Sequence, residues 1–76
     1  MSEKLTSLTG SEIVKALNKG GFLMVRIRGS HHFMRHPDRS ATVVPVHAGE
    51  TIGPGLLSKI LRDSGLGKDE FRELLD

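Results

Sequence analysis

Two adjacent histidines, His31 and His32, lie in the middle of the sequence, directly after the dipeptide Gly29-Ser30. Histidine suits proton transfer at neutral pH because the unperturbed imidazole pKa is about 6.5. Arginine suits a phosphate because its guanidinium donates two hydrogen bonds at once. The arginines near the histidines are Arg26, Arg28 and Arg35. RNA cleavage needs a base for the 2′-hydroxyl proton, cations for the charged phosphorane and an acid for the leaving 5′-oxygen. The cluster therefore predicts a site that handles a phosphodiester, either by binding the phosphate alone or by supplying the groups that RNA cleavage needs.

The histidines are predicted to begin the second strand of a β-hairpin. Apolar residues alternate from Phe22 to Arg28, as in a strand with one buried face. Gly29-Ser30 fits a two-residue type II′ turn, with glycine where φ must be positive. The expected core face carries Leu23, Val25, Ile27, His32, Met34 and His36. The expected exposed face carries Met24, Arg26, Arg28, His31, Phe33 and Arg35. This register separates the two histidines and favours His31 as the catalytic residue, because it shares a face with the arginines.

The remaining elements are predicted to support this hairpin. Thr9 and Glu12 form a capping box for a helix that ends at Gly20-Gly21. A third strand covers residues 41–46, a second helix opens at Gly53-Pro54 and ends at Gly65, and a short last helix covers residues 68–75. The expected fold is α+β, with the α-β-β-β-α order of double-stranded-RNA-binding domains and helices on one face of an antiparallel sheet. Residues 1–8 are expected to be a flexible lead-in to one domain over residues 9–76.

The composition favours a polyanionic partner. The chain has 76 residues and no cysteine. Residues 13–49 hold six basic residues, one acid and all four histidines. Such a basic stripe suits a nucleic acid, and it equally suits an acidic protein. No apolar run approaches a membrane span and no signal-peptide pattern opens the chain, so a cytoplasmic protein is expected.

Three other possibilities concern the histidines: a metal site, phosphate binding without catalysis, and a separate role for His47. His32 and His36 would lie about 13 Å apart along a strand, so no metal site is predicted. His31 would bind phosphate without chemistry if the domain were a non-catalytic RNA-binding module. His47, just after the third strand, would be a loop histidine, a phosphate contact or a second proton-transfer group.

The sequence resembles the HicA toxins, small mRNA interferases of type II toxin–antitoxin pairs. The resemblance covers Thr9 to Leu75 and rests on several segments that follow in order. These are Gly20-Gly21-Phe22, Arg28-Gly29-Ser30-His31-His32, Arg35-His36-Pro37-Asp38, Val44-Pro45-Val46-His47-Ala48-Gly49 and Ile60-Leu61-Arg62-Asp63-Ser64-Gly65-Leu66. Each segment alone is a weak signal, but together and in order they are specific.

The resemblance implies metal-independent RNA cleavage without a cofactor, growth arrest and neutralisation by a HicB-type antitoxin. The family's catalytic histidine maps onto His31, or onto His32 in members where it lies one residue later. The residues expected to bind RNA are Arg26, Arg28, Gly29, Ser30, Arg35 and His47. This chain departs from many members at Arg39, where they have glycine, and at Gly53 and Leu56, where they have lysine and threonine.

Overall fold

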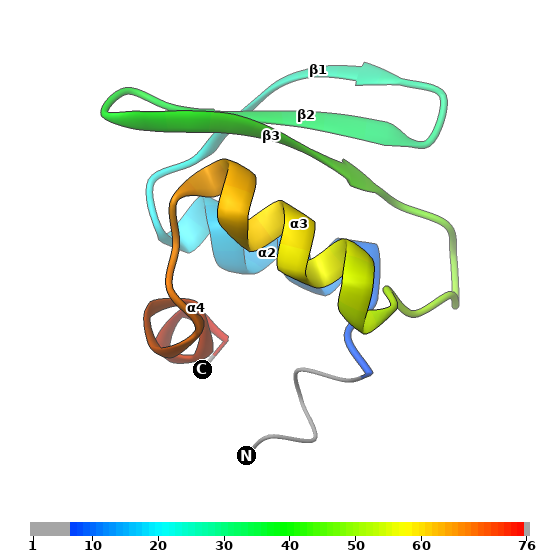
Figure 1. Ribbon diagram of the computed structural model, residues 1–76. Helices are drawn as coiled ribbons and strands as arrows, with labels where there is room; N and C mark the ends of the chain where they lie inside the picture. Colours follow the sequence, from blue (N-terminus) through cyan, green and yellow to red (C-terminus); the bar gives the residue numbers. More distant parts are fainter. Residues whose placement is uncertain (1–6, 76) are drawn as a thin grey trace.

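A computed structural model, which describes residues 7–75, shows one antiparallel sheet with all its helices on one side (Figure 1). The strands lie in the order β1-β2-β3, so β2 is central and the other two are edges. The elements are α2 (Gly10–Lys19), β1 (Leu23–Arg28), β2 (His31–His36), β3 (Arg39–Pro45), α3 (Pro54–Ser64) and α4 (Lys68–Leu74). Helices α2 and α3 lie side by side under the sheet, and α4 lies beyond them. The predicted α+β class and α-β-β-β-α order are confirmed.

The helix boundaries follow the predicted capping residues. The Glu12 backbone N–H donates to Thr9 Oγ1 at 3.2 Å, and the Thr9 N–H donates to Glu12 Oε1 at 2.9 Å, which completes the capping box. Gly65 ends α3 with a left-handed φ of 74°. No helix within residues 7–75 is long and apolar enough to cross a membrane.

The core lies between the helices and the inner face of β2 and β3. The buried apolar residues are Leu8, Ile13, Ala16, Leu17, Phe22, Met34, Val44, Ile52, Leu57, Ile60, Leu61, Leu66 and Phe71. Met34 was predicted to face the core, and it is buried. Leu8 is also buried, and its carbonyl accepts a 2.7 Å hydrogen bond from the Ile52 N–H, so the packed domain includes it. The rest of the predicted lead-in, residues 1–6, lies outside the described residues.

The predicted packing of the first strand is wrong. Leu23, Val25 and Ile27 were expected in the core, but their side chains are 62%, 60% and 52% exposed. One reason is that β1 is an edge strand, and the buried sheet positions lie on β2 and β3. The other is a bulge at Val25, which makes Met24, not Val25, the partner of Met34. The bulge also moves Met24 from its expected exposed face to the inner face.

Candidate active site at the hairpin tip

The β1–β2 turn has the predicted geometry. Gly29 has a φ of 60° and Ser30 does not have a positive φ, as a type II′ turn requires. Arg28 pairs with His31 across the turn. The Ser30 carbonyl oxygen accepts a 2.7 Å hydrogen bond from the Val46 N–H, just beyond β3. The tip is therefore tied to the far edge strand, which fixes the position of the histidines that follow.

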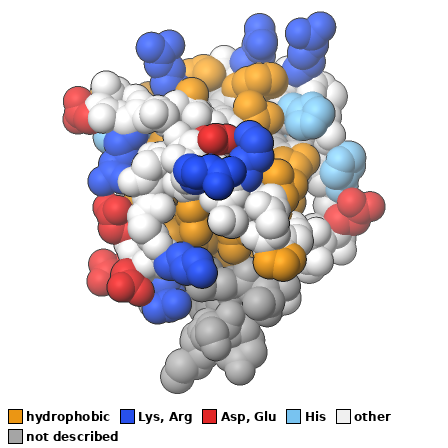
Figure 2. All heavy atoms as spheres, in the orientation of Figure 1, with side chains coloured by type: hydrophobic (Ala, Val, Ile, Leu, Met, Phe, Trp, Pro, Cys, Tyr) orange, Lys and Arg blue, Asp and Glu red, His pale blue; other side chains and the backbone are white. Residues whose placement is uncertain are grey.

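His31 lies with the arginines on the outer face of the sheet. It is exposed and pairs with Arg28 on one side and with Pro45 on the other. Arg26 and Phe33 are also paired, and the Arg26 guanidinium carbon lies 4.8 Å from the centroid of the Phe33 ring, as in a cation–π contact. Arg35 is exposed as well. Figure 2 shows basic side chains projecting from the sheet end of the molecule, with apolar side chains between them. The structure therefore places His31 on the same face of the sheet as the arginines, as the sequence predicted.

His32 lies on the opposite face, in a groove between α2 and the sheet. The groove has a volume of about 290 Å³. Its lining residues are Ser11, Val14, Lys15, Asn18, Met24, His32 and Val46. Sequence reasoning missed the polar groups from α2. Their signal was the i, i+4, i+7 spacing of Ser11, Lys15 and Asn18, which places them on one helix face beside the apolar stripe.

One hydrogen bond orients the His32 ring. Nδ1 lies 3.3 Å from the Ser30 carbonyl oxygen, and the side chain is half-buried. A carbonyl oxygen only accepts, so we assign the proton of the neutral ring to Nδ1. Nε2 is then left with its lone pair, as a general base needs. His31 and His32 thus differ in kind: the first lies among cations on an open face, and the second is held in a concave site.

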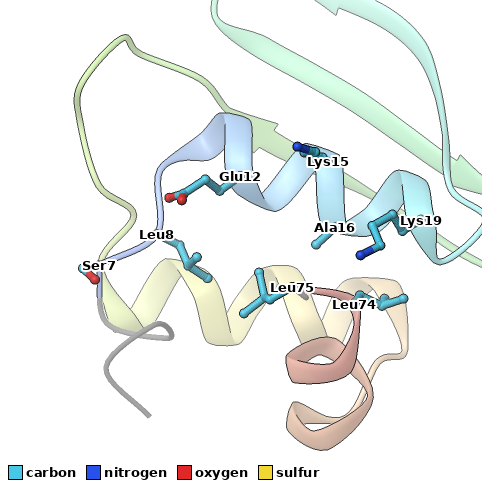
Figure 3. Close-up of a pocket in the computed structure, with 8 residues that line it drawn as sticks. All are labelled: Ser7, Leu8, Glu12, Lys15, Ala16, Lys19, Leu74 and Leu75. Carbon is cyan, nitrogen blue, oxygen red and sulfur yellow. The ribbon is translucent and has the colours of Figure 1, made fainter. Parts of the chain in front are cut away.

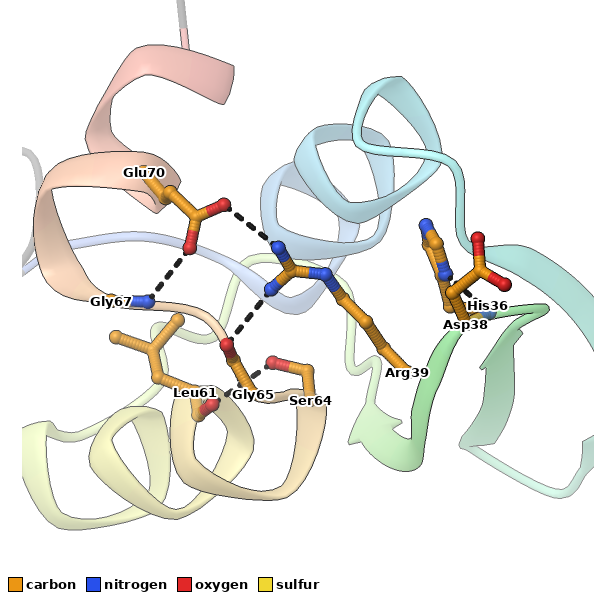
Figure 4. Close-up of polar contacts among 8 residues, drawn as sticks. All are labelled: His36, Asp38, Arg39, Leu61, Ser64, Gly65, Gly67 and Glu70. Atoms are coloured by element: carbon orange, nitrogen blue, oxygen red, sulfur yellow. Dashed lines mark hydrogen bonds and ion pairs between the residues drawn. The ribbon is translucent and has the colours of Figure 1, made fainter.

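His36, the third histidine of β2, has the reverse arrangement. Its Nδ1 accepts a 3.0 Å hydrogen bond from the Asp38 N–H, so the neutral ring carries its proton on Nε2 (Figure 4). The ring centroid lies 4.9 Å from that of the buried Phe22 ring. Gly21 approaches the same ring closely, because a Cβ there would lie 2.9 Å from Nε2. These contacts give His36 a structural role in the β2–β3 turn.

Arg39, which stands where many HicA toxins have glycine, makes contacts with a distant part of the chain. Its guanidinium donates to the Gly65 carbonyl oxygen at 2.8 Å and to Glu70 Oε2 at 3.0 Å (Figure 4). The side chain therefore joins the start of β3 to the junction between α3 and α4.

The other predicted site residues and grooves bear on the choice of site. His47 is exposed and follows β3 at the hairpin end of the sheet, where Pro45 pairs with His31. Among residues 7–75, no three His, Cys, Asp or Glu side chains gather in a way that could hold a metal ion. A groove of about 430 Å³ between α2 and α4 contains no histidine (Figure 3). It is lined by Ser7, Leu8, Glu12, Lys15, Ala16, Lys19, Leu74 and Leu75. A third groove, of about 480 Å³ at the other end of the sheet, is lined by His36 and by Asp38, Glu70 and Glu73. Three of the four histidines, His31, His32 and His47, therefore lie at the hairpin end, and His36 lies at the opposite end.

Comparison with known proteins identifies the family. A search of the curated proteins gives no match. The family model described as the HicA toxin of bacterial toxin–antitoxin systems matches residues 10–66, which is most of the 76-residue chain. The match runs from the start of α2 to just beyond α3, and so includes the whole sheet and both faces of the hairpin tip. The chain therefore belongs to the HicA toxin family.

Proposed function

We propose that this toxin is a metal-independent endoribonuclease that cleaves mRNA and so stops translation and growth. The observation that carries the proposal is the orientation of His32. Its Nδ1 is held by the Ser30 carbonyl oxygen, and the ring lines a groove that also contains Lys15 and Asn18. A base that is fixed in a concave, partly polar site is better placed for proton transfer than one on an open surface. We therefore rank His32 ahead of His31 as the catalytic residue.

The chemistry needs only what such a site supplies. Nε2 of His32 takes the proton from a ribose 2′-hydroxyl, and the 2′-oxygen attacks the adjacent phosphorus. The P–O2′ bond forms and the P–O5′ bond breaks, and solvent at the open groove protonates the leaving 5′-oxygen. Lys15, which lines the groove, supplies a cation for the phosphorane charge. RNA provides its own nucleophile in this step, so no metal-bound water is required.

The outer face is proposed to bind the flanking RNA. Arg26, Arg28 and Arg35 give a row of cations that suits successive phosphates. His31 is proposed to add a phosphate contact at the tip, and His47 another from the loop after β3. Gly29 and Ser30 allow the RNA backbone to turn over the tip from one face to the other. This assignment keeps every predicted RNA-binding residue, with His31 as a second candidate for proton transfer.

The partner proposed for the toxin is a HicB-type antitoxin in the same cytoplasm as the mRNA. A toxin that cuts the cell's own messages must be neutralised until it is needed. Its antitoxin would act most directly by covering the hairpin tip.

The deciding experiment is cleavage of a mixed RNA by the purified protein in the presence of chelator. We expect the wild type and His31→Ala to cut, and His32→Ala to lose at least about 100-fold in rate. RNA with 2′-O-methyl groups should resist cleavage, since it lacks the nucleophile. RNA that is bound but never cut would establish a non-catalytic binding module. Loss of activity in His31→Ala alone would return the catalytic role to the outer face.

A further inference from the structure

The most exposed apolar strand in the described chain is β1. Four of its six residues are large apolar side chains at the surface: Leu23, Met24, Val25 and Ile27, which are 46% to 62% exposed. The other exposed large apolar residues within residues 7–75 are Val43 and Leu56, which lie singly on β3 and α3. Isolated exposed apolar residues are ordinary, whereas a contiguous patch marks a binding surface.

The same strand offers backbone hydrogen-bonding groups. β1 is an edge strand, and no other strand of residues 7–75 pairs with its open side. Arg28 and His31 flank a two-residue turn and form the hydrogen-bonded pair there, so the next pair, Ile27 and His32, is not hydrogen-bonded. The Ile27 N–H and carbonyl therefore point to the open edge. Proteins normally guard such an edge, because it can pair with another chain.

The charge around this edge defines what can pair with it. β1 and β2 contain Arg26, Arg28 and Arg35 and no acidic residue. A second copy of the chain fits poorly, because antiparallel self-pairing of β1 centred on Arg26 or on Ile27 sets arginines of the two copies opposite each other. An extended segment that alternates apolar and acidic residues fits well, because its carboxylates meet the arginines and its apolar residues cover Val25 and Ile27.

We propose that the open edge of β1 is the docking site for an extended apolar and acidic segment of a protein partner, which adds a fourth strand to the sheet. The segment would border the His32 groove, because Met24 lines that groove and Ile27 is the cross-strand partner of His32. Docking there therefore narrows access to the groove. This inference rests on the proposed function only for the identity of the partner, because the segment would belong to the antitoxin. It does not depend on RNA cleavage.

The test is an NMR titration of the isotope-labelled protein with a blocked peptide of alternating glutamate and valine, as long as β1. A matched peptide with lysine in place of glutamate is the control. We expect the glutamate peptide to shift the β1 amides and to slow hydrogen exchange at Ile27, and the lysine peptide to do neither. The double variant Val25→Ser with Ile27→Ser should weaken binding at least about tenfold, a loss of about 1.4 kcal/mol. Leu56→Ser, an equivalent change on α3, should leave binding within about twofold.

Each other outcome would overturn the proposal. These outcomes are no shifts at the highest peptide concentration, equal binding of both peptides, equal binding by the double serine variant, and shifts confined to the groove between α2 and α4. Sedimentation of the wild type provides the remaining check, because a dimer that the double serine variant dissociates would make a second copy the occupant. Thermal unfolding confirms that the serine variants are folded, which their exposed positions favour. A protein that binds the peptide but does not cut RNA would refute the proposed function and leave this docking site intact.

Discussion

The two ends of β2 carry histidines on the same inner face of the sheet, yet their surroundings differ. At the hairpin end, His32 donates from Nδ1 to Ser30 and lines a groove with Lys15. At the other end, His36 accepts at Nδ1 from Asp38, and its ring packs against Phe22. Both side chains are half-buried. Exposure alone would rank the two histidines equally, but the partner at Nδ1 gives them opposite tautomers.

The difference between His32 and His36 indicates which hydrogen bond prepares a histidine to accept a proton. A carbonyl partner leaves Nε2 free to accept a proton, whereas a backbone N–H partner places the proton on Nε2. The structural end is also reinforced by Arg39, which reaches Gly65 and Glu70. The hairpin end is linked to the rest of the fold through the carbonyl of Ser30. These contacts therefore fix the His36 end of β2 to the rest of the fold, whereas the His32 end is accessible to a ligand.

The strongest test replaces each histidine with asparagine, whose amide sits near the position of Nδ1. His32→Asn keeps a donor for the Ser30 carbonyl but cannot take up a proton, so we expect at least about a 100-fold loss in cleavage rate. His36→Asn keeps an acceptor for the Asp38 N–H, so cleavage should stay within about threefold, with about 1 kcal/mol of stability lost as the ring leaves Phe22. Single-turnover cleavage and urea unfolding of both variants measure the contrast. Equal losses of activity would show that both histidines act through structure.

The second test compares the glycines beside the two histidines. Gly21→Ala should lower the free energy of unfolding by about 2–3 kcal/mol, because a positive φ strains alanine and the new Cβ meets the His36 ring. Gly29→Ala should cost only about 1 kcal/mol, since its φ is also positive but nothing lies within 4 Å of the added Cβ. Urea denaturation gives both values. A larger loss at Gly29 would make the hairpin end the more tightly determined one.

The third test concerns the cation beside His32. Lys15→Ala should slow cleavage about tenfold and lower the salt slope of RNA binding by about one. The matched control is Lys59→Ala on α3, where the ammonium lies 2.9 Å from an Asp63 carboxylate oxygen. That change should leave cleavage and the salt slope nearly unaltered. If Lys59→Ala had the larger effect, the RNA would have to cross α3 and not the groove.

Most of the scaffold could be predicted from local sequence, because its signals are local. Thr9 and Glu12 marked the start of α2, and Gly65 marked the end of α3. The register next to the turn was also predictable, since a two-residue turn aligns Arg28 with His31. The bulge at Val25 was not, because no glycine or proline marks it and it depends on how the edge strand twists.

Only the hairpin-tip part of the candidate site could be predicted from the sequence, for a related reason. His31, His32 and the arginines are neighbours in sequence, so the tip could be recognised without a structure. The groove depends on how α2 packs under the sheet, and this packing brings Lys15 to His32 from a distant part of the chain. The polar spacing on α2 indicated a face, but nothing local indicated what that face would meet.

The smallest expected effects come from the ion pair that supports the structural end. Arg39→Ala removes two hydrogen bonds from a partly exposed side chain and should cost about 1 kcal/mol of stability. Glu70→Gln should cost less than about 0.5 kcal/mol, because the bond from Arg39 to Gly65 remains and the amide oxygen of the new side chain can still accept from the Gly67 N–H. Added salt should reduce the difference between wild type and Glu70→Gln, since screening weakens exposed ion pairs. Thermal unfolding at low and high salt measures this. Neither variant should change the cleavage rate of the folded protein, because Arg39 and Glu70 act at the far end of the sheet from His32; a change in rate without a change in stability would mean that the two ends are coupled through β2.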